Sequence, residues 1–521
     1  MNLKWLSDAG AWLLVHKVLL GILLFPAALG VTVIALLVVE HVRGSVSLGR
    51  YIRVLTDQGE KMSPREFKLP PPTGENGAPE VLAAAEDLKE GTILPKIYPP
   101  RMKLTPAGHA VVCFQEEEWK ENKVTYRWEQ LAADLETNVA TLERIRRAMG
   151  KPVLDCVFDP SLGPKASFSH VAVPKTLAQW FGSRVQLGLH RGRTREFLPD
   201  LLTEIDLPRM LAQDKIAISE LVRDAIAAIA RGDTWEALQA DGWTEDDLAE
   251  IQRVWEKQEF NTAMVHALEG ERVFARSSYV MMRKSNKEAV SVLYGLEEYQ
   301  DERPQWEKWL RELPVGEAAA SFLKKQVYCR VWRFAWLEQD ELRYLRYLER
   351  LIALGREGLE KKSSRKLLPE VDDLVFASQN RGFYNRLRYP SVMSVNSLSR
   401  VFTRSMRAET ERSLVLAAIA LKRYALRHGS LPQSLSALAP ELLPSVPVDY
   451  MDGQPLRLRP QPEGGLVLYS VGEDGKDDGG DASLRPGKTN LRIFWERKDV
   501  VWPAPATAEE VEAYRVGSAK N

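Results

Sequence analysis

The chain has 521 residues, of which 45% are hydrophobic and 27% are charged, so it can form more than one globular domain with a sizeable core. Lysine plus arginine and aspartate plus glutamate each number 71, so no overall positive field favours nucleic acid as a partner. The three cysteines, at positions 113, 156 and 329, lie far apart without a CxxC pair, which argues against a zinc site and leaves room for at most one disulfide.

An apolar segment without charged residues runs from Val18 to Val39, after a flank of residues 1–17. As a helix rising 1.5 Å per residue it would be about 33 Å long, which is enough to cross the core of a bilayer. The segment is longer than the apolar region of a signal peptide, and no typical small-residue cleavage site precedes Glu40. We therefore expect residues 18–39 to form a retained transmembrane helix that contacts the lipid bilayer.

Residues 40–118 are predicted to form a proline-rich, irregular linker. The segment from Lys68 to Pro79 contains three consecutive prolines, which favour an extended spacer, and further prolines follow between Ile93 and Thr105. Folded structure is expected to begin near Trp119.

Residues 119–393 are predicted to form an α-helical domain. Apolar residues between Trp128 and Met149 recur at steps of three and four, which places them on one face of a helix. The same pattern predicts four further helices, of which the last follows a capping box formed by Thr244 and Asp247: 177–189, 197–211, 216–230 and 248–268. Short glycine-containing turns between these helices indicate helical hairpins.

A long helix is expected from Lys324 to Arg356. Its apolar side is predicted to face the core and contains Val327, Val331, Phe334, Leu337, Leu342, Leu345, Leu348 and Ile352. Two tryptophans at helical spacing, Trp332 and Trp336, are also expected to be core residues. The adjacent charged side chains favour a solvated face with weak ion pairs.

Residues 394–496 are predicted to form a small α+β domain, followed by a tail of residues 497–521. A helix should end at His428-Gly429, and a short second helix is expected from Ser434 to Leu443, between two prolines. Two alternating segments, 455–459 and 466–471, should pair as a β-hairpin. The whole chain is therefore predicted to be mainly α, with a transmembrane helix, a central domain of helical hairpins and this small domain.

A loop rich in aspartate and glycine follows the hairpin, from Gly472 to Asp481. Carboxylate oxygens on a flexible backbone can surround a calcium ion, so the candidate ligands are the backbone carbonyl of Val471 and the side chains of Asp474, Asp477, Asp478 and Asp481. The loop is not an EF-hand, because Lys476 and Arg485 occupy positions that require acidic ligands. A solvated acidic turn without a metal is the alternative.

The order of the helix, HGSLPQSL, LLPSVPVDYMDGQPLRLR and LVLYSVGEDGKDDGGD resembles the C-terminal globular part of the major pseudopilins of type II secretion. It also resembles the tail of large membrane-anchored proteins from bacteria of the planctomycete and verrucomicrobial type. The resemblance covers about 85 residues and implies a calcium-binding loop. The hydrophobic segment lies hundreds of residues earlier, and Gly30 precedes Val31 instead of the phenylalanine of a pilin cleavage site, so a fibre-forming subunit is not expected.

The orientation of the transmembrane helix is indicated by two conflicting observations. Lys4 and Lys17 lie before the helix, whereas Arg43, Arg50 and Arg53 lie after it, which slightly favours a cytoplasmic location for the following residues. A weak calcium site is useful only where calcium is abundant, outside the cytosol. We therefore expect a single-pass protein of the inner (cytoplasmic) membrane whose soluble part is periplasmic.

Catalytic motifs of the common kinds are missing from the sequence, including HExxH, GxSxG, GxGxxG and a complete P-loop. No catalytic residue is predicted, and a non-enzymatic envelope protein is favoured, of scaffold or secretion-associated type, with protein partners in the envelope. The alternative is a membrane-anchored hydrolase whose metal site is formed across domains.

Overall fold

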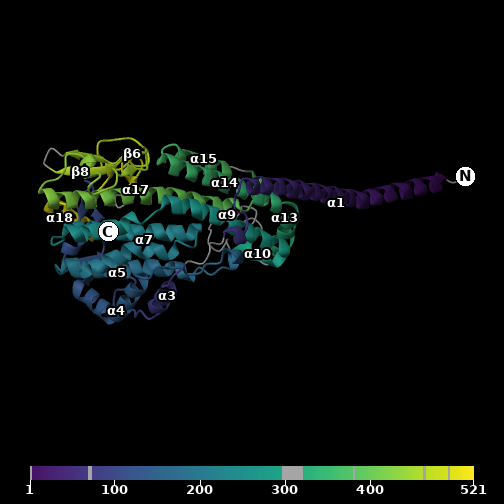
Figure 1. Cartoon of the computed structure of the whole chain (residues 1–521). Coiled ribbons are helices and arrows are strands. Elements are labelled where there is room, and N and C mark those ends of the chain that lie inside the picture. The colour runs from purple at the N-terminus through teal and green to yellow at the C-terminus, as the bar shows by residue number, and fades with distance from the viewer. Residues whose placement is uncertain are drawn as a thin grey trace. The chain divides into compact units, whose positions relative to one another are not determined.

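The computed structural model describes residues 3–67, 73–121, 123–295, 319, 321–379, 382–460, 465–490 and 493–520. The chain is mainly α, as predicted, and its short strands include a hairpin near the C-terminus (Figure 1). It divides into two compact units. Unit 1 contains residues 1–67, 275–347 and 379–393, and unit 2 contains residues 68–274, 348–378 and 394–521. Each unit therefore combines segments that are far apart in the sequence, which a linear division at residues 118 and 393 does not anticipate.

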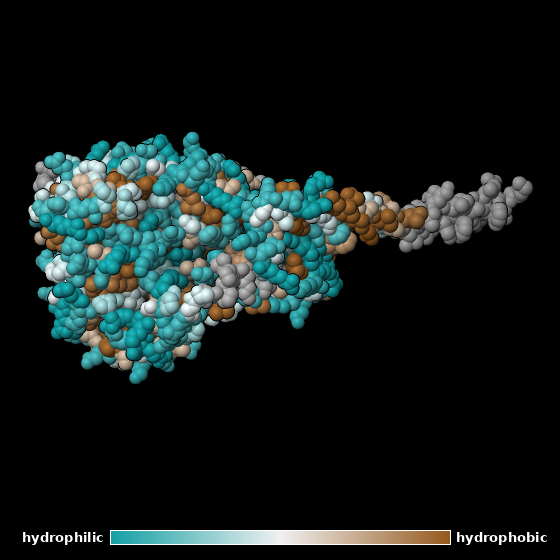
Figure 2. Space-filling model, viewed as in Figure 1, coloured by the Kyte–Doolittle hydropathy of each residue, from teal (hydrophilic) through white to brown (hydrophobic). Residues whose placement is uncertain are grey.

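Unit 1 begins with helix α1 (Leu3–Asp57). From Leu24 onward this helix is long and apolar enough to cross a membrane, and none of its most apolar stretch is buried. Figure 2 shows this stretch as a brown, apolar surface. Beyond Glu40 the same helix packs inside unit 1, where Leu48 and Leu55 contact Leu342 and Leu345. The membrane-spanning candidate therefore continues into the folded unit without a break.

The remaining described elements of unit 1 are short helices and the beginning of a longer one. They are α2 (Pro64–Phe67), the end of α9 (Asn261–Lys284), α10 (Asn286–Gly295), the π-helix η7 (Leu323–Tyr328), α13 (Cys329–Ala335), the first part of α14 (Leu337–Lys361) and α16 (Phe383–Arg388).

The long helix expected from Lys324 to Arg356 is in fact three pieces, η7, α13 and α14. In a π-helix each turn holds more residues than in an α-helix, so the side-chain positions rotate around the axis. Trp336, with φ −126° and ψ −8°, then interrupts the helix before α14. As a result, Val327 and Phe334 are exposed, although the apolar positions of α14 and Trp332 are buried as predicted.

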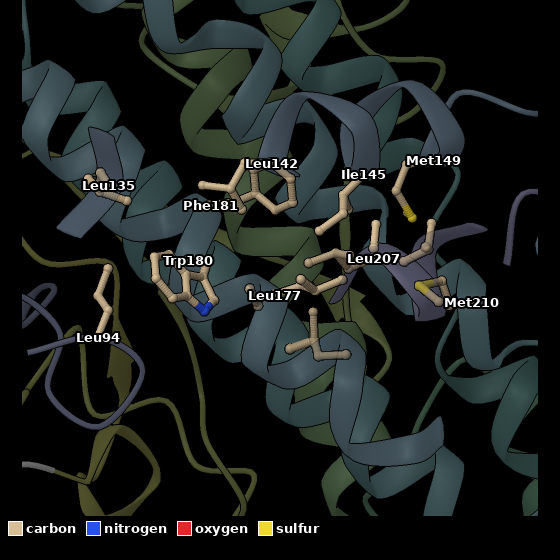
Figure 3. Packing of buried hydrophobic residues seen from close by; sticks show 14 of the residues in the cluster. Leu94, Leu135, Leu142, Ile145, Met149, Leu177, Trp180, Phe181, Leu207 and Met210 are labelled. Atoms are coloured by element: carbon tan, nitrogen blue, oxygen red, sulfur yellow. The ribbon is translucent and has the colours of Figure 1, made fainter. Parts of the chain in front are cut away.

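Unit 2 contains the larger helical core. Its main helices are α3 (Ala78–Glu86), α4 (Trp128–Met149), α5 (Ala172–His190), α6 (Leu198–Asp206), α7 (Ala217–Gln239), α8 (Glu245–Glu256), the first part of α9, the second part of α14, α15 (Leu367–Gln379), α17 (Val392–His428) and α18 (Ala508–Lys520). Figure 3 shows apolar side chains of α4, α5 and the 3-10 helix η5 (Leu207–Leu211) packed together, among them Leu142, Ile145, Leu177, Phe181 and Leu207. Helical periodicity predicted α4, α5 and α6 with η5 close to these bounds.

Several predicted boundaries are wrong. Residues 40–118 are not all irregular, because α1 extends to Asp57 and α3 buries Ala78, Val81 and Ala84 in the core. Helix α7 continues through Gly232, where an end was predicted. The single helix expected over 248–268 is divided between α8 and α9, although the capping box of Thr244 and Asp247 is confirmed. The linker residues 68–72 lie outside the described part of the chain.

The strands of unit 2 form small antiparallel sheets. Strand β1 (Lys103–Leu104) pairs with β2 (Ala110–Val111), β3 (Glu118–Glu121) with β4 (Val124–Arg127), and β5 (Val448–Asp449) with β6 (Gln454–Pro455). The predicted hairpin is confirmed as β7 (Arg457–Pro460) and β8 (Leu466–Ser470). A third strand, β9 (Val500–Val501), pairs with β8, so the expected tail begins with part of the sheet. The helix predicted over Ser434–Leu443 is only a 3-10 turn, Leu435–Leu438.

Candidate functional site

The aspartate and glycine loop connects β8 to the segment that leads to β9, and it lies wholly in unit 2. Its tight path depends on glycine at two positions in particular. Gly472 has φ +68°, and a Cβ there would lie 2.7 Å from the carbonyl oxygen of Lys498. Gly479 has φ +80°, and a Cβ would lie 2.8 Å from a guanidinium nitrogen of Arg459. Other side chains would therefore strain the loop at these positions.

Two fully buried aspartates outside the predicted ligand set hold the ends of this loop. Asp449 of β5 accepts hydrogen bonds from the hydroxyl of Ser470 at 2.8 Å and from the backbone N–H of Val471 at 2.9 Å. Asp499 accepts from the backbone N–H groups of Gly480 at 2.7 Å and Asp481 at 3.1 Å, with a longer contact of 3.4 Å to the N–H of Asp478. The loop is thus closed by protein donors and acceptors.

The pKa values of these two buried carboxyl groups are raised. Burial raises the pKa of Asp449 to about 6, against the opposing effect of its hydrogen bonds from Val471 and Met451. Burial likewise raises the pKa of Asp499, although the N–H donors of the loop favour its charged form. Both groups are therefore structural acceptors whose charge carries a desolvation cost.

Three of the four predicted side-chain ligands already have intramolecular partners. Asp474 accepts from the backbone N–H of Lys476 at 3.1 Å. Asp477 accepts from the hydroxyl of Tyr469 and from the N–H of Gly479, each at 2.9 Å. Asp481 pairs with the ammonium group of Lys498 at 2.8 Å.

The pKa values of two of these aspartates are lowered by such contacts. Burial alone would raise the pKa of Asp477, but the hydrogen bonds from Gly479 and Tyr469, together with nearby arginines, lower it below its usual value. The hydrogen bond from Lys498 is the main reason why the pKa of Asp481 is lowered. Both side chains are charged at neutral pH, which a calcium ligand requires, but their charges are already balanced by protein cations.

The remaining two candidate ligands differ in their surroundings. Asp478 is exposed and Val471 is fully buried. Within the described residues, no group of three or more histidine, cysteine, aspartate or glutamate side chains is arranged to hold a metal ion. Calcium binding by this loop therefore stays a prediction.

Contacts with helix α17 hold the loop region from a second direction. Glu473 accepts from the guanidinium of Arg407 at 2.8 Å and pairs with Arg485 at 2.9 Å. The indole N–H of Trp495 donates to Glu411 at 2.6 Å. These contacts attach the loop region to α17 through Glu473, which was not among the candidate ligands, and through side chains outside the loop.

A buried polar cluster at the centre of unit 2 is a second place with perturbed acids. Arg101 pairs with Asp233 of α7, and the amide of Gln186 donates to Asp233 at 2.7 Å. Glu204 of α6 is fully buried beside them, and its pKa is raised, first by burial and then by the charge of Asp233. The close approach requires Gly182, because a Cβ there would lie 2.3 Å from an oxygen of Asp233.

This cluster fixes the segment before and after strand β1 to helix α7. One turn after Asp233, Glu236 accepts from the backbone N–H groups of Met102 at 2.8 Å and Cys113 at 3.0 Å. Gly232 lies against Arg101, since a Cβ at this glycine would be 3.0 Å from the Cβ of that arginine. Gly232 lies beyond the predicted end of this helix at residue 230, and in the structure it provides room for the buried arginine inside α7.

A histidine, an aspartate and a serine also lie together in unit 2, but their order differs from that of a catalytic triad. Asp214 accepts from the hydroxyl of Ser219 at 2.5 Å and lies 2.9 Å from Nε2 of His170. In a triad the histidine lies between the other two residues, so that it can take the proton of the serine. Here the carboxylate occupies the middle, and Ser219 is fully buried.

A cavity of about 450 Å³ in unit 2 is lined by the ends of α4, α6 and α8, together with part of α7. Most of its cationic side chains pair with carboxylates. These pairs are Arg146 with Glu143, Lys151 with Glu80, Arg209 with Asp206, and Arg223 with Glu220. The pairing balances much of the positive charge that would attract an anionic ligand.

The buried aspartates were missed because sequence motifs emphasise clusters of acids. Asp449 and Asp499 are single acids, each beside a valine of a short strand. For Asp449, its position between two residues of high β-propensity, Val448 and Tyr450, is the signal that could have suggested a buried acceptor; Asp499 follows Lys498 and gives no such signal. Comparisons of the chain with models of protein families, with curated proteins and with solved structures found no match.

Proposed function

We propose that the protein is a single-pass membrane protein that presents a helical scaffold at the bacterial inner membrane, with its soluble part in the periplasm. In this role the two folded units bind other proteins of the envelope and catalyse no reaction. The orientation rests on the resemblance of the C-terminal domain to calcium-dependent pseudopilin domains, which operate outside the cytosol.

The observation that carries this proposal is the contrast between the two halves of α1. Side chains such as Leu24, Phe25 and Ile34 are 58%, 73% and 63% exposed, which is unfavourable for so many apolar residues in water. Later in the same helix, Leu48 and Leu55 are buried against α14. A bilayer around the first half would remove its apolar surface from water, and the second half would hold unit 1 at the membrane.

Membrane fractionation tests the anchor. The full chain is expected in the membrane fraction after washing with alkaline carbonate, and a variant lacking residues 2–39 is expected in the soluble fraction. Protease added to intact spheroplasts should digest the folded part if it is periplasmic. Release of the full chain by carbonate would refute the anchor, and protection from protease in intact spheroplasts would refute the orientation alone.

The calcium prediction is tested separately by thermal unfolding of the full-length protein in detergent. If the loop binds calcium, millimolar calcium should raise Tm relative to chelator, and magnesium should not, because only the folded state would bind the ion. The double variant Asp474→Asn, Asp478→Asn should abolish this rise, whereas Asp373→Asn, an exposed aspartate of α15, should leave it unchanged. A calcium-dependent rise that survives in the double variant would exclude these two ligands.

A further inference from the structure

An exposed apolar surface lies on η7, on the residue just before it and on α13, and the scaffold role does not say what this surface contacts. It consists of Phe322, Leu323, Val327 and Phe334, which are 61%, 42%, 47% and 47% exposed, and we call it the α13 face. The spacing of Leu323, Val327 and Phe334 places them along one side of the helix. Large apolar side chains that gather on one exposed helix face indicate a site of contact with a membrane or with another protein.

The opposite side of the same helix is packed inside unit 1. Cys329 and Trp332 are fully buried, and the indole N–H of Trp332 donates to the backbone carbonyl of Arg388 at 3.2 Å. The hydroxyl of Tyr328 donates to the carbonyl of Leu387 at 2.8 Å. The helix is therefore fixed to α16 by its inner side, and the α13 face is held outward as part of a rigid surface.

The α13 face begins where the apolar part of α1 ends. The ring of His41 stacks on the ring of Phe334 with centroids 5.1 Å apart, and Nδ1 of His41 lies 2.8 Å from the carbonyl oxygen of Phe334. The neighbouring Glu40 pairs with Arg388 and accepts a hydrogen bond from Gln339 at 2.6 Å. If α1 crosses the bilayer up to residue 39, Phe334 lies at the level of the lipid headgroups.

Charge and aromatic content favour a lipid surface over a protein as the occupant. The segment from Leu323 to Ala335 contains four cations and no acid, and two of these cations, Lys325 and Arg330, are exposed. Helix α16, which packs beside it, adds the exposed Arg386, and its Tyr384 is 52% exposed. Cations that flank apolar and aromatic side chains are typical of helices that lie at the interface of anionic membranes.

We propose that the α13 face docks onto the surface of an anionic bilayer, with its apolar side chains at the boundary between headgroups and acyl chains. This inference rests on the proposed anchor, because α1 brings the face to the membrane. Docking at a second site would restrict the tilt of unit 1 relative to the bilayer. It also explains why residues predicted to face the core are exposed.

Site-specific photocrosslinking of the full chain in vesicles tests the docking. A benzophenone amino acid is placed at Val327 in the α13 face, at Ile34 in the apolar part of α1, and at Val54 in α1. Val54 is 45% exposed, close to the 47% of Val327, and lies about 21 Å along the helix beyond Glu40. Vesicles contain either phosphatidylcholine alone or phosphatidylcholine with phosphatidylglycerol.

We expect lipid adducts at Ile34 and Val327, with a yield at Val327 at least fivefold above that at Val54 in vesicles containing phosphatidylglycerol. The yield at Val327 should fall in phosphatidylcholine alone, and also in the variant Lys325→Glu, Arg330→Glu, whose substitutions are at exposed positions. Circular dichroism of that variant checks that the fold is retained.

Docking of the α13 face and anchoring by α1 are contradicted by different results of this experiment. Adducts at Ile34 with only the Val54 level at Val327 would overturn docking and leave the anchor in place. No lipid adducts at Ile34 would overturn the anchor itself. Crosslinks from Val327 to another protein chain in place of lipid would also overturn docking, and would assign the face to a protein interface.

Discussion

Replacement of Asp499 by alanine tests whether a buried carboxylate, rather than a cation, holds the aspartate and glycine loop. The change removes the acceptor of the N–H groups of Gly480 at 2.7 Å and Asp481 at 3.1 Å, and of a weaker contact at 3.4 Å. Each short hydrogen bond to a charged group is worth about 1.5–3 kcal/mol. The removed carboxylate also loses its desolvation cost, so we expect the loop to be destabilised by about 2–4 kcal/mol.

Hydrogen exchange of the full chain, followed by mass spectrometry in chelator, measures this local stability. A loss of about 2–4 kcal/mol corresponds to exchange about 30- to 1,000-fold faster in peptides that contain residues 478–481. The control Asp474→Ala removes an exposed aspartate of the same loop, and it should change this exchange less than about threefold. Unchanged exchange at 478–481 in the Asp499→Ala variant would refute the assigned role of Asp499.

Three further predictions concern unit 2. Burial raises the pKa of Glu236 to about 8, so its contribution to stability is full below about pH 4.5 and is lost as pH rises through 8. The free energy of unfolding from denaturant titrations should therefore fall between pH 5 and 8.5, and Glu236→Gln should reduce this fall by at most about 4 kcal/mol. Gly182→Ala should destabilise unit 2 by about 2–4 kcal/mol in denaturant titrations, because the new Cβ meets Asp233. The control Gly49→Ala has open space around the new Cβ in α1 and should be neutral or slightly stabilising. Equal effects of the two substitutions would contradict the close packing at Gly182. Thr244→Ala should cost about 1 kcal/mol in the same titrations through loss of the cap of α8, and no loss would mean that the cap is replaced by water.

Local patterns predicted the elements whose structure is decided locally. The capping box at Thr244, the helix that ends at His428 and the hairpin of β7 and β8 follow from side-chain spacing and turn residues within a few positions. The errors occur where contacts with residues distant in the sequence, or a change of helix type, determine the structure. Helix α7 passes through Gly232 because Arg101, far away in sequence, packs against it. The π-helix η7 changes which side chains face inward, and periodicity assumes a constant number of residues per turn.

At the candidate site, too, local sequence patterns could not predict the contacts made by residues that are distant in the sequence. The four clustered aspartates were visible in the sequence. The residues that organise their loop, Asp449 and Asp499, are single acids in or next to short strands that approach the loop only in the fold. Lys498, which pairs with Asp481, was likewise assigned to the tail. Composition can therefore find a loop that is rich in oxygen ligands. It cannot decide whether those oxygens face an ion or a protein donor.

The continuity of α1 constrains where the folded part can act. At about 1.5 Å per residue, the part of the helix from Glu40 to Asp57 is about 26 Å long. Because Leu48 and Leu55 in this part are buried against α14, unit 1 cannot move away from the membrane without losing that packing, which would cost several kcal/mol. A protein that tethers a partner by a flexible linker would not need such packing. If α1 spans the bilayer, unit 1 therefore lies within about 30 Å of the lipid surface, and a partner that binds unit 1 must itself be a membrane protein or lie close to the membrane.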